Sequence, residues 1–202
     1  MKARLPFIFL FVLGLAFALL LMTFRSLVIA FTAVLLNLLS VAAAYGILVA
    51  VFQFGWLHSL FGFQTNGAIV TWIPLFLFVI LFGLSMDYHV FILSRVKELH
   101  DAGAHTEDAV RLAITRTAGT VTSAAVIMVA VFGIFSTLAL IQLQQMGFGL
   151  AVAVLLDATV VRAILLPATM KLLGEWNWYL PRWLDWLPSL SPEADGPLVP
   201  VD

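Results

Sequence analysis

An aspartate inside a long apolar stretch is the residue of this chain best placed to do chemistry. Asp87 lies within residues 80–93, most of which are aliphatic or aromatic, and Tyr88 follows it directly. A carboxylate at membrane depth costs about 2.5–3.5 kcal/mol on insertion scales, so a specific role must keep it there. Movement of protons or ions, an ion pair and intramembrane catalysis are three roles that suit such a group.

A second set of charges occupies an apolar stretch near the carboxyl end. It consists of Asp157 and Arg162. An arginine stays charged in proteins, so Arg162 needs a partner. Counting residues at the α-helical rise of 1.5 Å puts Arg162 at a depth similar to that of Asp87, with Asp157 about 7–8 Å nearer the outer side. Arg162 is therefore a possible charge partner of Asp87, and Asp157 is the other possible partner in this charged set.

Two interpretations of these charges remain open. An aspartate–arginine pair could simply lock two helices together. Alternatively, burial and a nearby cation act in opposite directions on the tendency of Asp87 to hold a proton, so a change of conformation could load or release it. We favour the second interpretation, because charges inside membranes are usually functional.

The two residues after Asp87 have weaker claims to a role. Tyr88 could donate a hydrogen bond to a carboxylate on another helix or pack as an ordinary aromatic side chain. His89 suits proton chemistry, but it points about 100° away from Tyr88 on a regular helix. We therefore expect Tyr88 to act with Asp87 in a proton relay and His89 to be structural.

Composition identifies the chain as an integral membrane protein. Of its 202 residues, 63% are hydrophobic and only 10% are charged, and the mean hydropathy is +1.10; soluble domains carry about 25% charged residues. The absence of cysteine excludes disulfides and thiolate metal sites. A net charge of −1 gives no reason to expect a nucleic-acid partner. We expect no metal and no cofactor.

Five apolar stretches are long enough to cross a bilayer as helices, which requires about 20 residues each. They predict an all-α, polytopic bundle within residues 1–173, with spans at 6–24, 27–52, 69–93, 120–140 and 148–172. A charged cytoplasmic loop with an amphipathic helix is expected at 95–118. A tryptophan-rich interfacial segment is expected at 174–188, followed by a disordered tail at 189–202.

The distribution of basic residues predicts the orientation, because loops on the cytoplasmic side are enriched in Lys and Arg. With the amino terminus outside, Lys2 and Arg4 are the basic residues left on the outer side. The inner loops and tail then collect seven: Arg25, Arg95, Lys97, Arg111, Arg116, Lys171 and Arg182. We therefore predict that the amino terminus lies outside and the carboxyl terminus in the cytoplasm.

Three motifs together resemble those of one transporter family. Gly83-Leu-Ser-Met-Asp87-Tyr88, continued to Arg95, is similar to the Asp-Tyr motif of the MMPL family in the resistance–nodulation–division superfamily. Residues 156–162 and 173–178 resemble the carboxyl end of the same family. The resemblance covers nearly the whole chain.

This resemblance implies a fold and a function. Family members have twelve transmembrane helices in two repeats, and this chain looks like helices eight to twelve, the carboxyl-terminal transmembrane half. It implies export of lipids or other hydrophobic compounds, driven by the proton gradient across the bacterial inner (cytoplasmic) membrane. Asp87 and Tyr88 match the second of two Asp-Tyr pairs in the family. The expected partners are therefore the missing amino-terminal half, the lipid bilayer and a hydrophobic or lipid substrate.

Two alternatives accompany this expectation. The chain could be a non-transporting remnant or an assembly subunit of such a transporter. It could also be an intramembrane aspartyl protease, since two aspartates on separate helices can act as acid and base. The protease pattern would require Gly-x-Gly-Asp, which does not occur at Asp87. We therefore expect a protein that is not an enzyme.

Overall fold

The chain folds as a bundle of long helices. A computed structural model describes residues 5–56, 68–181, 184 and 186. The long helices are α1 (Leu5–Phe24), α2 (Leu27–Phe52), α4 (Ile73–Asp101), α5 (Thr106–Phe135) and α6 (Ile141–Leu156). Three shorter elements continue directly from α6: η2 (Asp157–Leu165), α7 (Leu166–Leu173) and η3 (Gly174–Trp178).

Five helical stretches are long and apolar enough to cross a membrane, the fifth running from α6 through η3. Helix α4 alone has 29 residues, or about 43 Å at the α-helical rise, against a hydrocarbon core of about 30 Å. The described part of the chain contains no strand. The predicted all-α bundle of five transmembrane helices is therefore confirmed.

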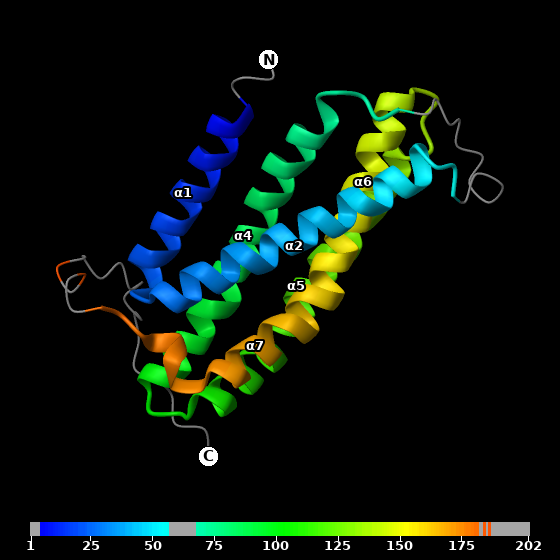
Figure 1. Ribbon diagram of the computed structural model, residues 1–202. Coiled ribbons are helices and arrows are strands. Elements are labelled where there is room, and N and C mark those ends of the chain that lie inside the picture. Colours follow the sequence, from blue (N-terminus) through cyan, green and yellow to red (C-terminus); the bar gives the residue numbers. More distant parts are fainter. Residues whose placement is uncertain (1–4, 57–67, 182–183, 185, 187–202) are drawn as a thin grey trace.

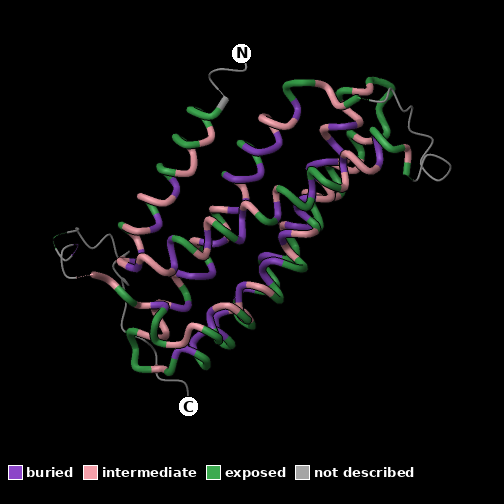
Figure 2. Tube along the Cα trace, in the orientation of Figure 1, coloured by how far each residue is buried: buried purple, intermediate pink, exposed green. Residues whose placement is uncertain are grey.

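The helices are arranged around α2. Figure 1 shows α2 crossing the bundle obliquely between α1 and the paired α5 and α6, with α4 behind it. Helices α2, α4 and α6 pack against one another, and α5 packs on α4 and α6. Figure 2 shows that buried positions gather where these helices meet. Helices α1 and α5 keep most of their surface outward, with 17% and 11% of their most apolar windows buried.

The ends of the helices differ from the predicted ends of the membrane spans. The region 95–118, predicted as a charged loop that contains an amphipathic helix, is almost entirely helical, because α4 continues to Asp101 and α5 begins at Thr106. Its amphipathic part and the following span form one 30-residue helix. Hydropathy detects the apolar part of a helix, but the backbone hydrogen bonds continue through polar residues until a breaker, here Gly103 with φ of 97°.

The turn between α5 and α6 is also shorter than predicted. Helix α6 begins at Ile141, inside the region placed between the spans 120–140 and 148–172. Its polar residue Gln145 is buried, accepts a hydrogen bond from Val70 N–H at 3.1 Å and donates one to the Ala68 carbonyl at 3.1 Å. A polar residue near the start of α6 therefore holds the chain that leads into α4 through two hydrogen bonds.

The described part of segment 174–188 docks on the helix ends. The Trp178 ring stacks on His100 at 4.3 Å between centroids, and its indole N–H donates to Thr106 Oγ1 at 3.0 Å. Ser26 at the start of α2 donates to the Asn177 carbonyl. This part of the predicted tryptophan-rich interfacial segment thus joins the ends of α2, α4 and α5. The predicted disordered tail, residues 189–202, lies outside the described residues.

Candidate functional site

The helix that begins as α6 changes its hydrogen bonding at Asp157. Through η2 it is a π-helix, in which an N–H bonds to the carbonyl five residues earlier; at its end Leu166 N–H donates to the Val161 carbonyl. Pro167 follows, and because proline has no N–H, the Ala163 carbonyl has no α-helical donor. Such π-turns are rare and occur frequently at functional sites.

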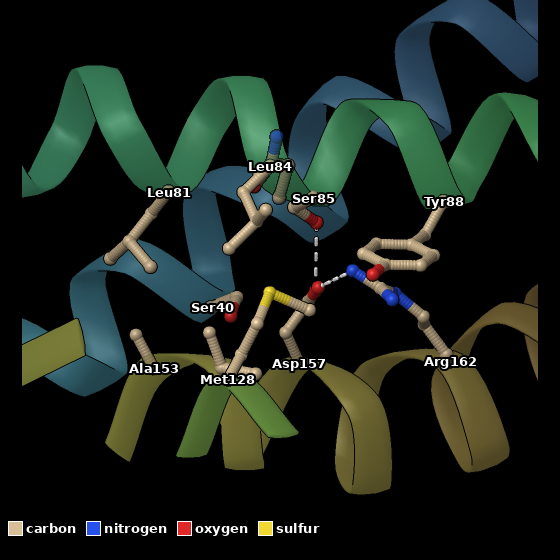
Figure 3. Close-up of a pocket in the computed structure, with 11 residues that line it drawn as sticks. Ser40, Leu81, Leu84, Ser85, Tyr88, Met128, Ala153, Asp157 and Arg162 are labelled. Atoms are coloured by element: carbon tan, nitrogen blue, oxygen red, sulfur yellow. Dashed lines mark hydrogen bonds and ion pairs between the residues drawn. The ribbon is translucent and has the colours of Figure 1, made fainter. Parts of the chain in front are cut away.

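The wider turn brings Asp157 and Arg162 together. Residues five positions apart point about 140° away from each other on an α-helix, whereas bonding over five residues stacks them on adjacent turns. Arg162 donates from Nη2 to Asp157 Oδ2, and each side chain of this ion pair is 6% exposed. Ser85 on α4 donates to Asp157 Oδ1 at 2.9 Å, as Figure 3 shows.

Tyr88 contacts the positive partner of this ion pair. The Arg162 guanidinium carbon lies 4.4 Å from the centre of the Tyr88 ring, which is a cation–π geometry. Ser85 and Tyr88 are three residues apart and therefore share one face of α4. That face holds the carboxylate through Ser85 and the guanidinium through Tyr88, so the ion pair connects α4 to η2 (Figure 3).

Asp87 occupies a different face of α4. It is exposed, as are Gly83 and Phe91, one turn before and after it. In the described part of the chain, no ion pair or hydrogen bond reaches the Asp87 carboxylate. The structure thus joins Tyr88, Asp157 and Arg162 from the predicted site and leaves Asp87 outside this cluster. Arg162, a possible partner of Asp87, is bound to Asp157 instead.

His89 is buried beside the cluster. It is 1% exposed, and its Nδ1 lies 3.1 Å from the Ser85 carbonyl and 3.4 Å from Ser85 Oγ. This histidine therefore lies against the residue that binds Asp157, closer to the ion pair than its separation from Tyr88 indicated.

A small cavity adjoins the ion pair. It has a volume of about 10 Å³ and is bounded by α2, α4, α5, α6 and η2. Its polar lining consists of Asn37, Ser40, Ser85, Tyr88, Asp157 and Arg162. Asn37 donates from Nδ2 to the Phe82 carbonyl at 3.3 Å, which ties α2 to α4. The ion pair therefore borders polar groups from α2 as well as α4.

Reasoning from the sequence missed Ser85 and the contribution of Asn37. The spacing of Ser85, Tyr88 and His89 was a usable signal, because positions i, i+3 and i+4 share a face of a helix. The same spacing places Asp87, at i+2, about 200° from Ser85. The spacing of apolar residues does not mark the π-turn, because the apolar pattern continues on both sides of Asp157.

Fold and site together define a polytopic helical membrane protein with an ion pair in its core. The sequence model of the MMPL family matches residues 2–186. The chain therefore belongs to the MMPL family.

Several relatives share substantial identity with the chain. It is 47% identical over 96% of its length to the mycolic acid-containing lipids exporter MmpL11 of Mycolicibacterium smegmatis. It is 46% identical over its whole length to the heme uptake protein MmpL11 of Mycobacterium tuberculosis, and 36% identical over 91% of its length to the trehalose monomycolate exporter MmpL3 of the same species. The chain spans 20%, 21% and 19% of these relatives, respectively.

Proposed function

We propose that the chain acts as the carboxyl-terminal transmembrane half of a proton-driven exporter of lipids or other hydrophobic compounds, and that Asp87 carries the proton. The names of two relatives describe lipid exporters. In this proposal the amino terminus lies outside, the carboxyl terminus lies in the cytoplasm, and the membrane is the bacterial inner membrane. The proton gradient is the energy source.

The position of Asp87 supports a site in the middle of the membrane that another part of the transporter covers. Asp87 is the middle residue of α4, about 21 Å from each end. It lies between apolar positions that are themselves outward, Ile80 at 38% and Phe91 at 46% exposure. Charged side chains at this depth almost always face protein or water rather than lipid. This face of α4 is therefore where we place the other transmembrane half of the transporter.

The main observation in support of a proton-carrying Asp87 is that Arg162 is paired with Asp157. Because Asp157 neutralises Arg162, that cation is not committed to Asp87. A carboxylate with no fixed counter-ion in the described chain can gain and lose a proton as its surroundings change. Tyr88 follows Asp87 in the sequence and contacts Arg162 from the neighbouring face of α4, so it lies between Asp87 and the buried ion pair along the helix surface.

The test is export by the intact transporter, meaning this chain together with the rest of the family's membrane domain. Asp87→Asn keeps the shape of the side chain but cannot bind a proton, so export driven by the proton gradient should be lost. Asp108→Asn is the matched control, because Asp108 is an exposed aspartate in the first turn of α5. Normal export by a folded Asp87→Asn protein would refute the proposal.

The protease alternative fits this geometry poorly. An aspartyl protease requires two carboxylates that share a proton, whereas Asp157 accepts from Arg162 and Ser85 in a buried ion pair. The assembly-subunit alternative differs from the exporter in its test. A subunit without a relay role would leave export unchanged in the Asp87→Asn variant.

A further inference from the structure

The geometry points to a binding site for one internal water molecule, held between α2, α4 and η2 against the Asp157–Arg162 ion pair. The cavity beside that pair has a volume of about 10 Å³. A cavity needs about 10–15 Å³ to hold a single water, together with two to four polar partners. Its size therefore admits one water and little more.

Two unsatisfied atoms belong to residues that line this cavity. Asn37 is 2% exposed and Arg162 is 6% exposed. Among the described residues, neither Asn37 Oδ1 nor Arg162 Nε has a hydrogen-bond partner. The large majority of buried side-chain polar atoms in native proteins have one. A water can accept from the Arg162 Nε–H and donate to Asn37 Oδ1, which satisfies both.

The orientation of the Asn37 amide is fixed independently. Its Nδ2 donates to the Phe82 carbonyl at 3.3 Å. Reversing the amide would place an oxygen against that carbonyl, so Oδ1 is the atom left unpaired. The unsatisfied atom is therefore an acceptor, and it requires a donor such as water.

Further polar partners lie around the same cavity. Ser40 on α2 is 4% exposed and also lines the cavity. Ser85 and Asp157 also line the cavity. Figure 3 shows Ser40, Ser85 and Asp157 arranged around one space. The site thus offers groups from three helices, which meets the number of partners that a buried water needs.

A sodium ion would use the same oxygen atoms, but the charge distribution favours water. The Arg162 guanidinium lies at the site and already balances Asp157. A second cation would be repelled by Arg162 and would have no unbalanced carboxylate there. Neutral water meets neither difficulty. The water then links α2 to the buried ion pair, because among the described residues no direct hydrogen bond joins α2 to Asp157 or Arg162.

The primary test is a density map of this chain in lipid nanodiscs at a resolution that shows ordered water. We expect one peak within hydrogen-bond distance of Asn37 Oδ1. Asn37→Leu, which removes both polar atoms of the amide, should abolish the peak. Absence of solvent density in the wild-type cavity would overturn the inference, whether or not the variant folds.

A double-mutant cycle gives a second readout. Asn37 and Arg162 share no direct hydrogen bond, so water should be what couples them. We expect the fall in Tm of Asn37→Leu/Arg162→Gln to be smaller than the sum of the two single falls. Asn177→Leu combined with Arg162→Gln is the control and should be additive, because Asn177 bonds to Met170 and Gly174 instead. Additivity in both cycles would contradict the water site.

Comparing the Tm in two salts distinguishes a bound water from a bound cation. The Tm of the wild-type chain should be the same in sodium chloride and in choline chloride at equal ionic strength. A rise in Tm specific to sodium would overturn the assignment of water in favour of an ion.

Discussion

At the scale of single residues, the ion pair allows Asp157 and Arg162 to remain charged in the core, where either charge without its partner would be costly. Asp157 and Arg162 lie in the core with 6% of each side chain exposed. Taking two charges out of water is expensive, and their attraction offsets that cost when further hydrogen bonds are present. Ser85 and the Tyr88 ring provide these contacts. The cluster should therefore tolerate loss of both charges better than loss of one.

This gives a prediction about stability. Arg162→Gln leaves Asp157 buried without its cation and should destabilise the fold by about 3–5 kcal/mol. The double variant Asp157→Asn/Arg162→Gln should recover most of this loss, because no isolated charge remains. Thermal unfolding in detergent measures both. A double variant less stable than Arg162→Gln alone would contradict this account of the pair.

At the scale of elements, close contact between α5 and α6 positions the start of the long last span. A Cβ at Gly147 would lie 2.6 Å from the Phe132 carbonyl oxygen and 2.7 Å from Ser136 N, both backbone atoms. Backbone cannot move aside as a side chain does, so the helices would have to separate. The absence of a side chain at Gly147 therefore sets the distance between these helices.

Two glycine substitutions test this contact. Gly147→Ala should destabilise the fold by about 1–3 kcal/mol, the usual cost of overpacking. Gly133→Ala on α5 is the control, because a Cβ there meets nothing within 4 Å. Since alanine favours helix over glycine by up to about 1 kcal/mol, Gly133→Ala should be neutral or stabilising. Equal effects of the two substitutions on thermal unfolding would show that close packing at Gly147 is not what matters.

The elements also show how far the sequence predicts this structure. Long apolar stretches predict five membrane helices, because a backbone in lipid must satisfy its hydrogen bonds internally. Counting along a regular α-helix did not predict that Asp157 and Arg162 bind each other, because the chain forms a π-turn there, before Pro167. The partner of Arg162 depended on that turn. The faces of Ser85, Tyr88 and Asp87 were accessible to helical spacing, but their neighbours on other helices were not.

At the scale of the whole molecule, the proposed orientation assigns each end of the bundle to one side of the membrane. The end of α2 and the connection between α4 and α5 lie at opposite ends of the bundle (Figure 1). With the amino terminus outside, Gln53 lies outside and Ala102 lies in the cytoplasm. Both residues are exposed, so both can report the sidedness.

The natural absence of cysteine makes this orientation directly measurable. Gln53→Cys should react with a membrane-impermeant maleimide in intact cells. Ala102→Cys should react only after the membrane is permeabilised. The reverse pattern would mean that the orientation inferred from the basic residues is wrong.

For the whole molecule, we propose that Asp87 carries a proton across the middle of the membrane. One proton moving down 100 mV releases about 2.3 kcal/mol, which is available to drive export. The most direct measurement is substrate-dependent proton flux in vesicles that contain the intact transporter. We predict proton flux with the wild-type protein and with Asp108→Asn, and none with Asp87→Asn at equal amounts of folded protein. Proton flux through Asp87→Asn equal to that of the wild type would show that Asp87 does not carry the proton.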